Sequence, residues 1–177
     1  MIKIGITGHR NLDEKFIENY KQKVSIKVKK EYSEIILYSA LADGADRLIV
    51  YEAIKLDIKF VAILPMKKDV YENDFNTISK IEFDKLLNKA YFIVQIAQKN
   101  TFSKDIQYEL SGHYISDNSK LLFALWDGKD TGLQGGTSEI VKYHLKNEKE
   151  ICHIKVDRND ILLKSHHDTW TNKKNIR

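Results

Sequence analysis

The sequence predicts a single α/β domain, built as a doubly wound, mainly parallel sheet with helices on both faces. Short apolar runs alternate with longer stretches in which apolar residues recur every three or four positions. The short runs are apolar throughout, which is typical of strands covered on both faces. A length of 177 residues also fits one domain better than two. Repeated alternation of strands and helices favours a parallel, Rossmann-like sheet.

The expected elements follow in order. Strands are expected at 1–7, 34–39, 59–64, 91–97, 120–125 and 150–156. Helical spacing covers 17–28, 45–56, 73–87, 106–114 and 140–145. We therefore assign residues 1–160 to one ligand-binding domain and 161–177 to a polar C-terminal tail that is expected to fray.

Composition narrows the class of protein. Hydrophobic residues make up 42% of the chain and charged residues 31%, as in a globular domain with a well-solvated surface. The single cysteine, Cys152, excludes an internal disulfide and is expected to be buried in the last strand. No apolar run is long enough for a signal peptide or a membrane span. We expect a cytoplasmic protein without a membrane partner.

Glycines gather where the expected strands end. Gly8 follows the first strand and Gly44 the second, and four more glycines follow the fifth. Open parallel sheets bind their ligands outside the carboxyl ends of the strands. The sequence therefore predicts one composite pocket made from three loops.

The first two loops combine small residues with groups that bind anions. In the first, Thr7, Gly8, His9 and Arg10 offer a hydroxyl, close backbone approach, an imidazole and a guanidinium for phosphate. The second precedes an amphipathic helix whose N-terminus can hold an anion. Its candidate ligand-binding residues are Ser39, Ala42, Gly44 and Asp46. The alternative for Asp43 or Asp46 is a simple helix cap.

The third loop carries the most specific local pattern. Phosphate is expected to rest on N–H groups where Gly135, Gly136 and Thr137 open the last helix. Glu139 is a candidate for a ribose hydroxyl or for catalysis, with a favourable first-turn charge as the alternative. The candidates in this loop are Asp127, Gly128, Gly135, Gly136, Thr137 and Glu139.

Metal and cofactor signals are weak. The triplet 166–168, His-His-Asp, contains metal-ligating residue types, but it stands in a polar tail without a partner cluster. We expect no metal site and no cofactor. The net charge of +4 is spread along the chain, which makes nucleic acid an improbable partner.

The loops together resemble the SLOG superfamily, the Rossmann-like group that includes the cytokinin-activating LOG proteins and the DNA-processing DprA proteins. The segments that carry the resemblance span residues 1–156. They are GITGHR (5–10), SALADGADRLIVYEAI (39–54), FVAILPM (60–66), YENDF (71–75), LLFALWDG (121–128) and GGTSEIV (135–141). They look closest to the branch found in bacterial conflict and nucleotide-signalling systems, which implies a role in phage defence.

The sequence departs from the LOG enzymes at one position that matters for catalysis. LOG enzymes place a catalytic arginine on the helix before the fifth strand, which corresponds here to the neighbourhood of Ser111. No arginine occurs between Arg47 and Arg158. Glu139 is therefore present without its partner, which disfavours LOG-type hydrolysis and leaves phosphate binding intact.

The function that follows is binding of a nucleotide or nucleotide-derived signal, of the NAD or ADP-ribose type or another phosphorylated nucleoside, by a sensor or sequestering protein. The first alternative is a LOG-like nucleoside-phosphate N-glycosidase that uses Glu139. The second is a DprA-like binder of single-stranded nucleic acid. We also expect a homo-oligomer that works with an effector protein.

Overall fold

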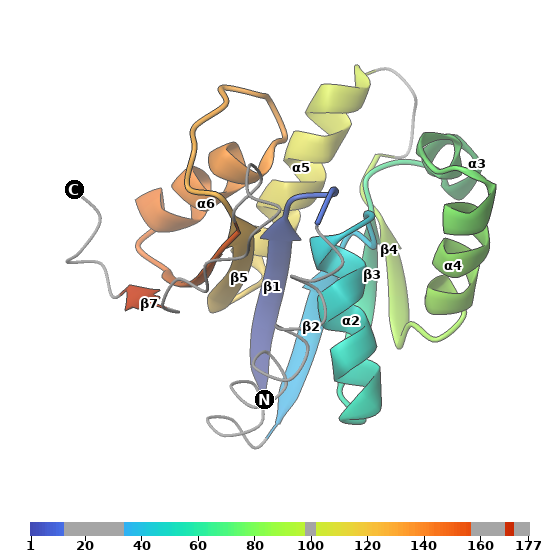
Figure 1. Ribbon diagram of the computed structural model, residues 1–177, viewed down its shortest axis with the longest axis horizontal. Coiled ribbons are helices and arrows are strands. Elements are labelled where there is room, and N and C mark those ends of the chain that lie inside the picture. The colour runs from blue at the N-terminus through green and yellow to red at the C-terminus, as the bar shows by residue number, and fades with distance from the viewer. Residues whose placement is uncertain (13–33, 98–101, 157–168, 172–177) are drawn as a thin grey trace.

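The computed structural model describes residues 1–12, 34–97, 102–156 and 169–171 (Figure 1). They form a seven-stranded sheet in the order β4-β3-β2-β1-β5-β6-β7. The first six strands pair in parallel, and β7 runs antiparallel to β6. The strands are β1 (Ile2–Gly8), β2 (Ile35–Ser39), β3 (Lys59–Leu64), β4 (Phe92–Gln95), β5 (Leu121–Trp126), β6 (Glu150–Lys155) and β7 (Thr169–Thr171).

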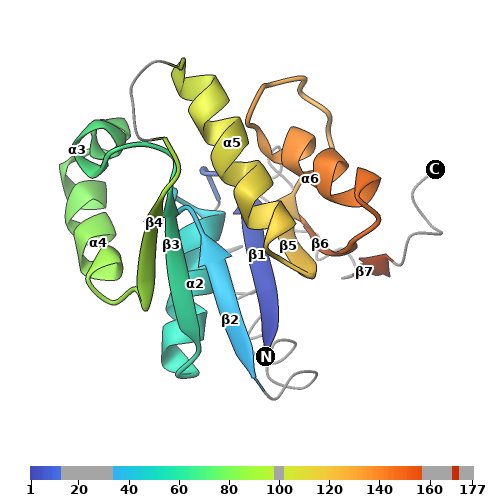
Figure 2. The same cartoon turned by 180° about the vertical axis from the view of Figure 1, so that it is seen from behind.

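Helices cover both faces of the sheet (Figures 1 and 2). They are α2 (Ala45–Lys55), α3 (Lys68–Tyr71), the 3-10 turn η1 (Glu72–Asp74), α4 (Thr77–Leu87), α5 (Lys104–Asp117) and α6 (Thr137–Lys146). Apolar side chains of α2 and α4 pack on one face, in a cluster with Ile4, Leu37 and Phe60. Residues of α5 and α6 pack on the other face, in a cluster with Ile36 and Leu122. The doubly wound Rossmann-like fold is therefore confirmed.

Each central strand supplies both clusters because alternate side chains point to opposite faces. In β5, Leu121 and Phe123 belong to the α2 side, whereas Leu122 and Ala124 belong to the α5 side. This explains why the strands appear in the sequence as continuous apolar runs. Cys152 is buried in β6, as expected.

Most element bounds differ from the expectation by one to three residues, and two segments differ in kind. The helix expected at 73–87 is divided into η1 and α4, and Asn76 caps α4 by accepting a hydrogen bond from Ser79 N at 2.9 Å. Part of the tail expected to fray instead forms β7. A strand can form there because β6 would otherwise leave its backbone edge unpaired. The helix expected at 17–28 lies outside the described residues, as does the triplet 166–168.

The chain order reverses between β1 and β5, which lie side by side with Gly8 opposite Leu125. The strands from β1 to β4 progress toward one edge, and α5 then returns the chain to the other side of β1. The loops that follow β1 and β5 separate at this point and leave room for a ligand. Among the helices in the described ranges, none is long and apolar enough to cross a membrane.

Candidate functional site

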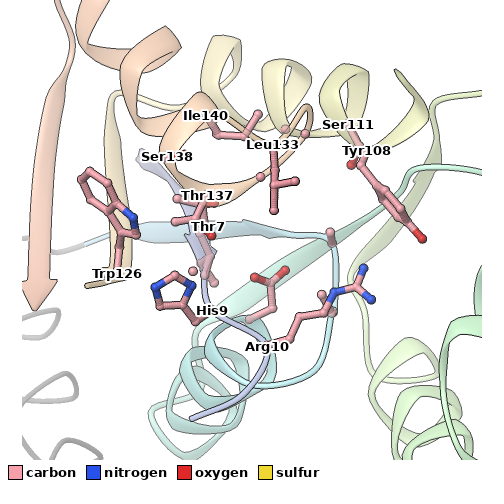
Figure 3. A pocket seen from close by; sticks show the side chains of 18 of the residues that line it. Thr7, His9, Arg10, Tyr108, Ser111, Trp126, Leu133, Thr137, Ser138 and Ile140 are labelled. Atoms are coloured by element: carbon pink, nitrogen blue, oxygen red, sulfur yellow. The ribbon is translucent and has the colours of Figure 1, made fainter. Parts of the chain in front are cut away.

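A pocket of about 390 Å³ opens at the carboxyl ends of β1 and β5 (Figure 3). This volume lies in the range of small-molecule sites, about 300–1,000 Å³. All three glycine-bearing loops contribute to its wall, and α5 closes it from above the sheet. Nine residues predicted from the sequence line it: Thr7, Gly8, His9, Arg10, Ala42, Asp46, Gly135, Gly136 and Thr137.

The other five predicted residues do not line the pocket. Ser39, Gly44 and Asp127 support residues that line the pocket, as described below. Gly128 adopts a positive φ of 84° in the loop after β5. Glu139 points toward α5 instead of into the pocket.

The first loop is held by close backbone packing. His9 N donates to Leu125 O at 3.0 Å, and His9 O accepts from Ala45 N at 3.1 Å. A Cβ on Gly8 would lie 2.4 Å from Ala45 Cβ, and one on Gly44 would lie 2.1 Å from Arg10 O. Both glycines are therefore needed for this approach, and the φ of 78° at Gly44 adds a second reason.

His9 and Asp127 form a buried pair at the floor of the pocket. His9 Nε2 lies 3.2 Å from Asp127 Oδ1 and 3.1 Å from the Asp127 backbone N. A neutral ring accepts from that N–H, and a ring protonated at Nε2 donates to the carboxylate. Burial raises the pKa of Asp127, but the Lys129 N–H and His9 lower it by more, so the net shift is downward.

Asp46 presents a buried carboxyl group to the pocket. Ser39 Oγ donates to Asp46 Oδ2 at 3.0 Å, and the same hydroxyl accepts from Leu41 N. Desolvation by burial raises the pKa of Asp46 to about 6, although the Ser39 hydroxyl and nearby N–H groups oppose the rise. Neither Asp43 nor Asp46 caps α2, because its N-cap residue is Gly44 without a side-chain bond.

Arg10 supplies the positive charge of the pocket. Its guanidinium lies over the ring of Tyr108, 5.3 Å from the ring centroid, and the side chain is exposed. Figure 3 shows Arg10 and Tyr108 on one side of the pocket, with His9 and Trp126 on the other. The Tyr108 hydroxyl donates to Asp74, and Lys104 pairs with the same carboxylate. Tyr108 therefore positions Arg10 at the rim.

The third loop brings the N-terminus of α6 to the pocket. No side chain caps this end, so the N–H groups of its first turn remain available for an anion. Gly135 has a φ of 69°, and a Cβ there would lie 2.8 Å from Glu109 N. Gly136 has an ordinary φ of −79°, so the left-handed residue of this turn is Gly135.

Glu139 is held by α5. Its Oε1 lies 2.8 Å from His113 Nε2, and its other oxygen is buried without a hydrogen-bond partner. A carboxylate turned in this direction cannot reach a ligand through the pocket wall formed by Thr137 and Ser138.

Arg47, which lies in the first turn of α2 after the second loop, has a structural role. It is 3% exposed, and its Nη1 lies 2.8 Å from both Asp43 Oδ1 and Glu82 Oε2. Its guanidinium also lies 4.6 Å from the centroid of Phe75. These contacts attach α2 to α4 and leave Arg10 as the arginine that lines the pocket.

Sequence reasoning missed the wall supplied by α5. Tyr108, Ser111, Gly112 and Ile115 line the pocket, and their spacing of three and four places them on one helix face. That spacing was visible in the sequence, but it is equally typical of a helix face buried in the core. Other lining residues not predicted as ligand-binding are Ile6, Asn11, Ala40, Tyr71, Trp126, Thr131, Leu133, Ser138 and Ile140.

Comparison with known proteins identifies the fold. No protein-family model matches the chain, and no curated protein matches its sequence. DNA processing protein A (DprA) from Streptococcus pneumoniae superposes with a TM-score of 0.69 at 12% identity, over 90% of this chain and 52% of that one. The chain shares the fold of DprA.

Two further solved structures agree. DprA from Helicobacter pylori superposes with a TM-score of 0.62 at 15% identity, over 90% of this chain and 67% of that one. TM1055, a structural genomics target, superposes with a TM-score of 0.54 at 11% identity, over 85% of this chain and 72% of that one. The chain thus spans about half the length of the Streptococcus DprA. At these identities the likeness concerns the fold alone, which is the Rossmann-like architecture that the alternation of strands and helices predicted.

Proposed function

We propose that the pocket binds a nucleotide or nucleotide-derived signal, of the NAD or ADP-ribose type or another phosphorylated nucleoside, and that the chain acts as a sensor or sequestering protein. One observation carries the proposal: Arg10 and the uncapped N-terminus of α6 line the same pocket, although they are far apart in sequence. A guanidinium and free helix N–H groups are both suited to phosphate. We also propose that the chain forms a homo-oligomer and acts together with an effector protein.

The rest of the wall suits a nucleoside. Tyr71, Tyr108 and Trp126 offer aromatic surface for a base, and the Asp46 carboxyl group can accept a hydrogen bond from a sugar hydroxyl. The pocket thus combines apolar surface with a few polar groups, as small-molecule sites do.

Thermal unfolding with a panel of AMP, ADP, NAD and linear and cyclic ADP-ribose tests binding. A ligand at a hundred times its Kd stabilises the fold by about 2.7 kcal/mol. For a chain of this size, each kcal/mol raises Tm by about 2–4 °C. The absence of a shift across the panel, together with a ligand-free native mass spectrum, would overturn the proposal.

A double-mutant cycle tests whether the first and third loops hold one ligand. Arg10→Ala should weaken binding by about 1.5–3 kcal/mol and Thr137→Ala by about 0.5–1.5 kcal/mol. The double variant should lose less than the sum of both if the two side chains share a phosphate. Lys85→Ala removes one exposed charge on α4 and serves as the control, with unchanged affinity. Strictly additive losses in calorimetry would mean that the two loops act independently.

The hydrolase alternative now depends on Asp46. Glu139 does not line the pocket, whereas Asp46 does and has a pKa of about 6, in the range useful for proton transfer. We nevertheless expect no base release from nucleoside monophosphates, because Glu139, the carboxylate that matches the LOG pattern, is paired with His113 and does not line the pocket. Base release that disappears in Asp46→Asn but persists in Glu139→Gln would establish a hydrolase of a different kind.

Single-stranded DNA is the second alternative, favoured by the shared fold with the Helicobacter DprA, whose structure is titled for its single-stranded DNA binding mode. With a net charge of only +4, we expect weak binding that falls steeply with salt. Fluorescence anisotropy of a labelled oligonucleotide at two salt concentrations measures this. Tight binding at physiological salt that is lost in Arg10→Ala would assign the pocket to DNA.

A further inference from the structure

We propose that Glu109, His113 and Glu139 bind one divalent transition-metal ion of the zinc class, at a site between α5 and α6. Each residue offers one ligand atom, and these atoms all lie within 4.8 Å of one another. None of the three lines the pocket described above, so the site is separate from the proposed nucleotide site.

The three side chains come from two helices in close contact. Glu109 and His113 are four residues apart in α5 and therefore share one helix face. Glu139 lies in the first turn of α6. The helices can approach closely because residue 112 is glycine: a Cβ there would lie 2.2 Å from Ile140 Cδ1. Ligands on packed helices are held more precisely than ligands on loops.

An unsatisfied oxygen points to a cation at this place. Glu139 Oε1 is paired with His113 Nε2, but Glu139 Oε2 has a solvent-accessible area below 1 Å² and no hydrogen-bond partner. The side chain as a whole is 30% exposed, so the carboxylate sits at the surface with one oxygen turned inward. Oxygen atoms of this kind are unfavourable unless something compensates them, and a metal ion would do so.

The neighbours of the ligands orient them. Gln134 Nε2 donates to Glu109 Oε2 at 2.5 Å, which leaves the other oxygen of Glu109 for a metal. The His113 ring stacks on Tyr143, with centroids 3.7 Å apart and planes 17° from parallel. Hydrogen bonds and packing around the ligands are typical of metal sites.

The ligand set indicates the class of metal. One imidazole and two carboxylates suit Zn²⁺, Mn²⁺, Co²⁺ or Fe²⁺, whereas Mg²⁺ and Ca²⁺ prefer oxygen ligands throughout. In tetrahedral zinc geometry, bonds of about 2.1 Å place ligand atoms about 3.4 Å apart. The His113–Glu139 contact of 2.8 Å would open and the longest separation would close, both within side-chain rotation. Water would occupy the fourth position.

Cobalt titration of the full chain, stripped beforehand with a chelator, tests the site. We expect one Co²⁺ per chain, with the intense visible absorption of a tetrahedral site, and competition by Zn²⁺. Three variants replace one ligand each by glutamine: Glu109→Gln, His113→Gln and Glu139→Gln. Each should weaken Co²⁺ binding by at least about 100-fold, since loss of a residue that only orients a metal ligand already lowers metal affinity by about 10–100-fold. Circular dichroism and Tm without metal verify that each variant folds.

The tail histidines provide the matched control. His166→Ala with His167→Ala removes the other clustered histidines of the sequence and should leave Co²⁺ binding unchanged. The proposal is overturned if wild-type protein binds no Co²⁺ in calorimetry, or if binding follows the tail histidines and survives in His113→Gln. In that case the His113–Glu139 contact is an ordinary ion pair. Neither outcome bears on nucleotide binding, which is measured separately.

Discussion

At the scale of single residues, Asp46 has an environment that a sequence does not reveal. Its carboxyl group is buried at the start of α2, and desolvation outweighs the hydrogen bond from Ser39 and raises its pKa to about 6 from 3.8. The folded state therefore binds a proton more readily than the unfolded state does. This group stabilises the fold fully below pH 3.8, and that contribution is lost as the pH rises through about 6.

We predict that Asp46→Asn changes how stability depends on pH. A pKa difference of about two units corresponds to about 3 kcal/mol at most. The wild type should lose this contribution between about pH 4 and pH 7, and the variant should not. Urea denaturation at both pH values measures the difference, with Asp105→Asn as the control for an exposed carboxylate on α5. Parallel curves for wild type and Asp46→Asn would contradict the prediction.

The candidate residues lie at the pocket where backbone geometry sets their position. Nine of the fourteen candidates line the pocket because strand ends and glycine turns fix their positions. Glu139 did not follow, because helix rotation decides its direction: positions 137 and 138 face the pocket and position 139 faces α5. The rotation of α6 depends on contacts with His113 and Gly112, which are distant in sequence. Whether the fourteen bind a ligand stays a prediction.

At the scale of elements, His144 joins α6 to the sheet. It is fully buried; its Nε2 lies 2.9 Å from Glu150 O and its Nδ1 lies 2.8 Å from Ser116 Oγ. Because a carbonyl oxygen only accepts, Nε2 carries the hydrogen and Nδ1 accepts from the serine. Burial lowers the pKa of His144 to about 4, so the ring is neutral in the fold.

His144 should make the protein sensitive to acid in the direction opposite to Asp46. With a folded-state pKa of about 4 against 6.5 unfolded, its contribution is present above pH 6.5 and is lost as the pH falls through 4. The loss amounts to about 3 kcal/mol at most. His144→Gln should abolish this part of the acid destabilisation and lower stability at pH 7 through imperfect hydrogen bonding. Denaturation from pH 7 to pH 4 tests it, and an unaltered acid slope in the variant would contradict it.

The elements themselves were largely predictable. The parallel strands are apolar on both faces, so their runs stand out in the sequence, and β3 has the expected bounds of 59–64. The division of 73–87 into η1 and α4 was not predictable from apolar spacing. It results from Asn76, which caps α4, and from Phe75, whose ring packs against Tyr71 and interrupts the helix.

At the scale of the whole molecule, the place of the pocket could be predicted because topology alone determines it. Parallel strands put all their carboxyl ends at one edge, and a doubly wound order leaves a gap where the direction reverses. The full set of side chains that line the pocket could not be predicted from the sequence, since the packing of α5 across β1 decides which of them close it. For the same reason, the proposed metal site between α5 and α6 was not predicted from the sequence: Glu109, His113 and Glu139 meet only through helix packing.

The sheet leaves an apolar edge at β4. Tyr91, Phe92 and Ile93 are 51%, 61% and 53% exposed. Among the described strands, β4 pairs with β3 alone and is therefore an edge strand of the sheet. An exposed apolar edge strand is a template for pairing with another chain.

We predict that the protein is a homo-oligomer and that β4 contributes to the contact between two copies. Light scattering after size exclusion should give at least twice the 20.6 kDa of one chain. Phe92→Lys should reduce this mass, because lysine on an edge strand disfavours strand pairing and brings an unpaired charge into an apolar contact.

Leu133→Lys is the matched control: it introduces the same charge at a side chain that is 64% exposed, in the loop before α6, and should leave the mass unchanged. A wild-type mass equal to one chain across the accessible concentration range would refute the oligomer. An oligomer that persists in Phe92→Lys would instead place the contact on another surface, because strand pairing at β4 could not tolerate the charge.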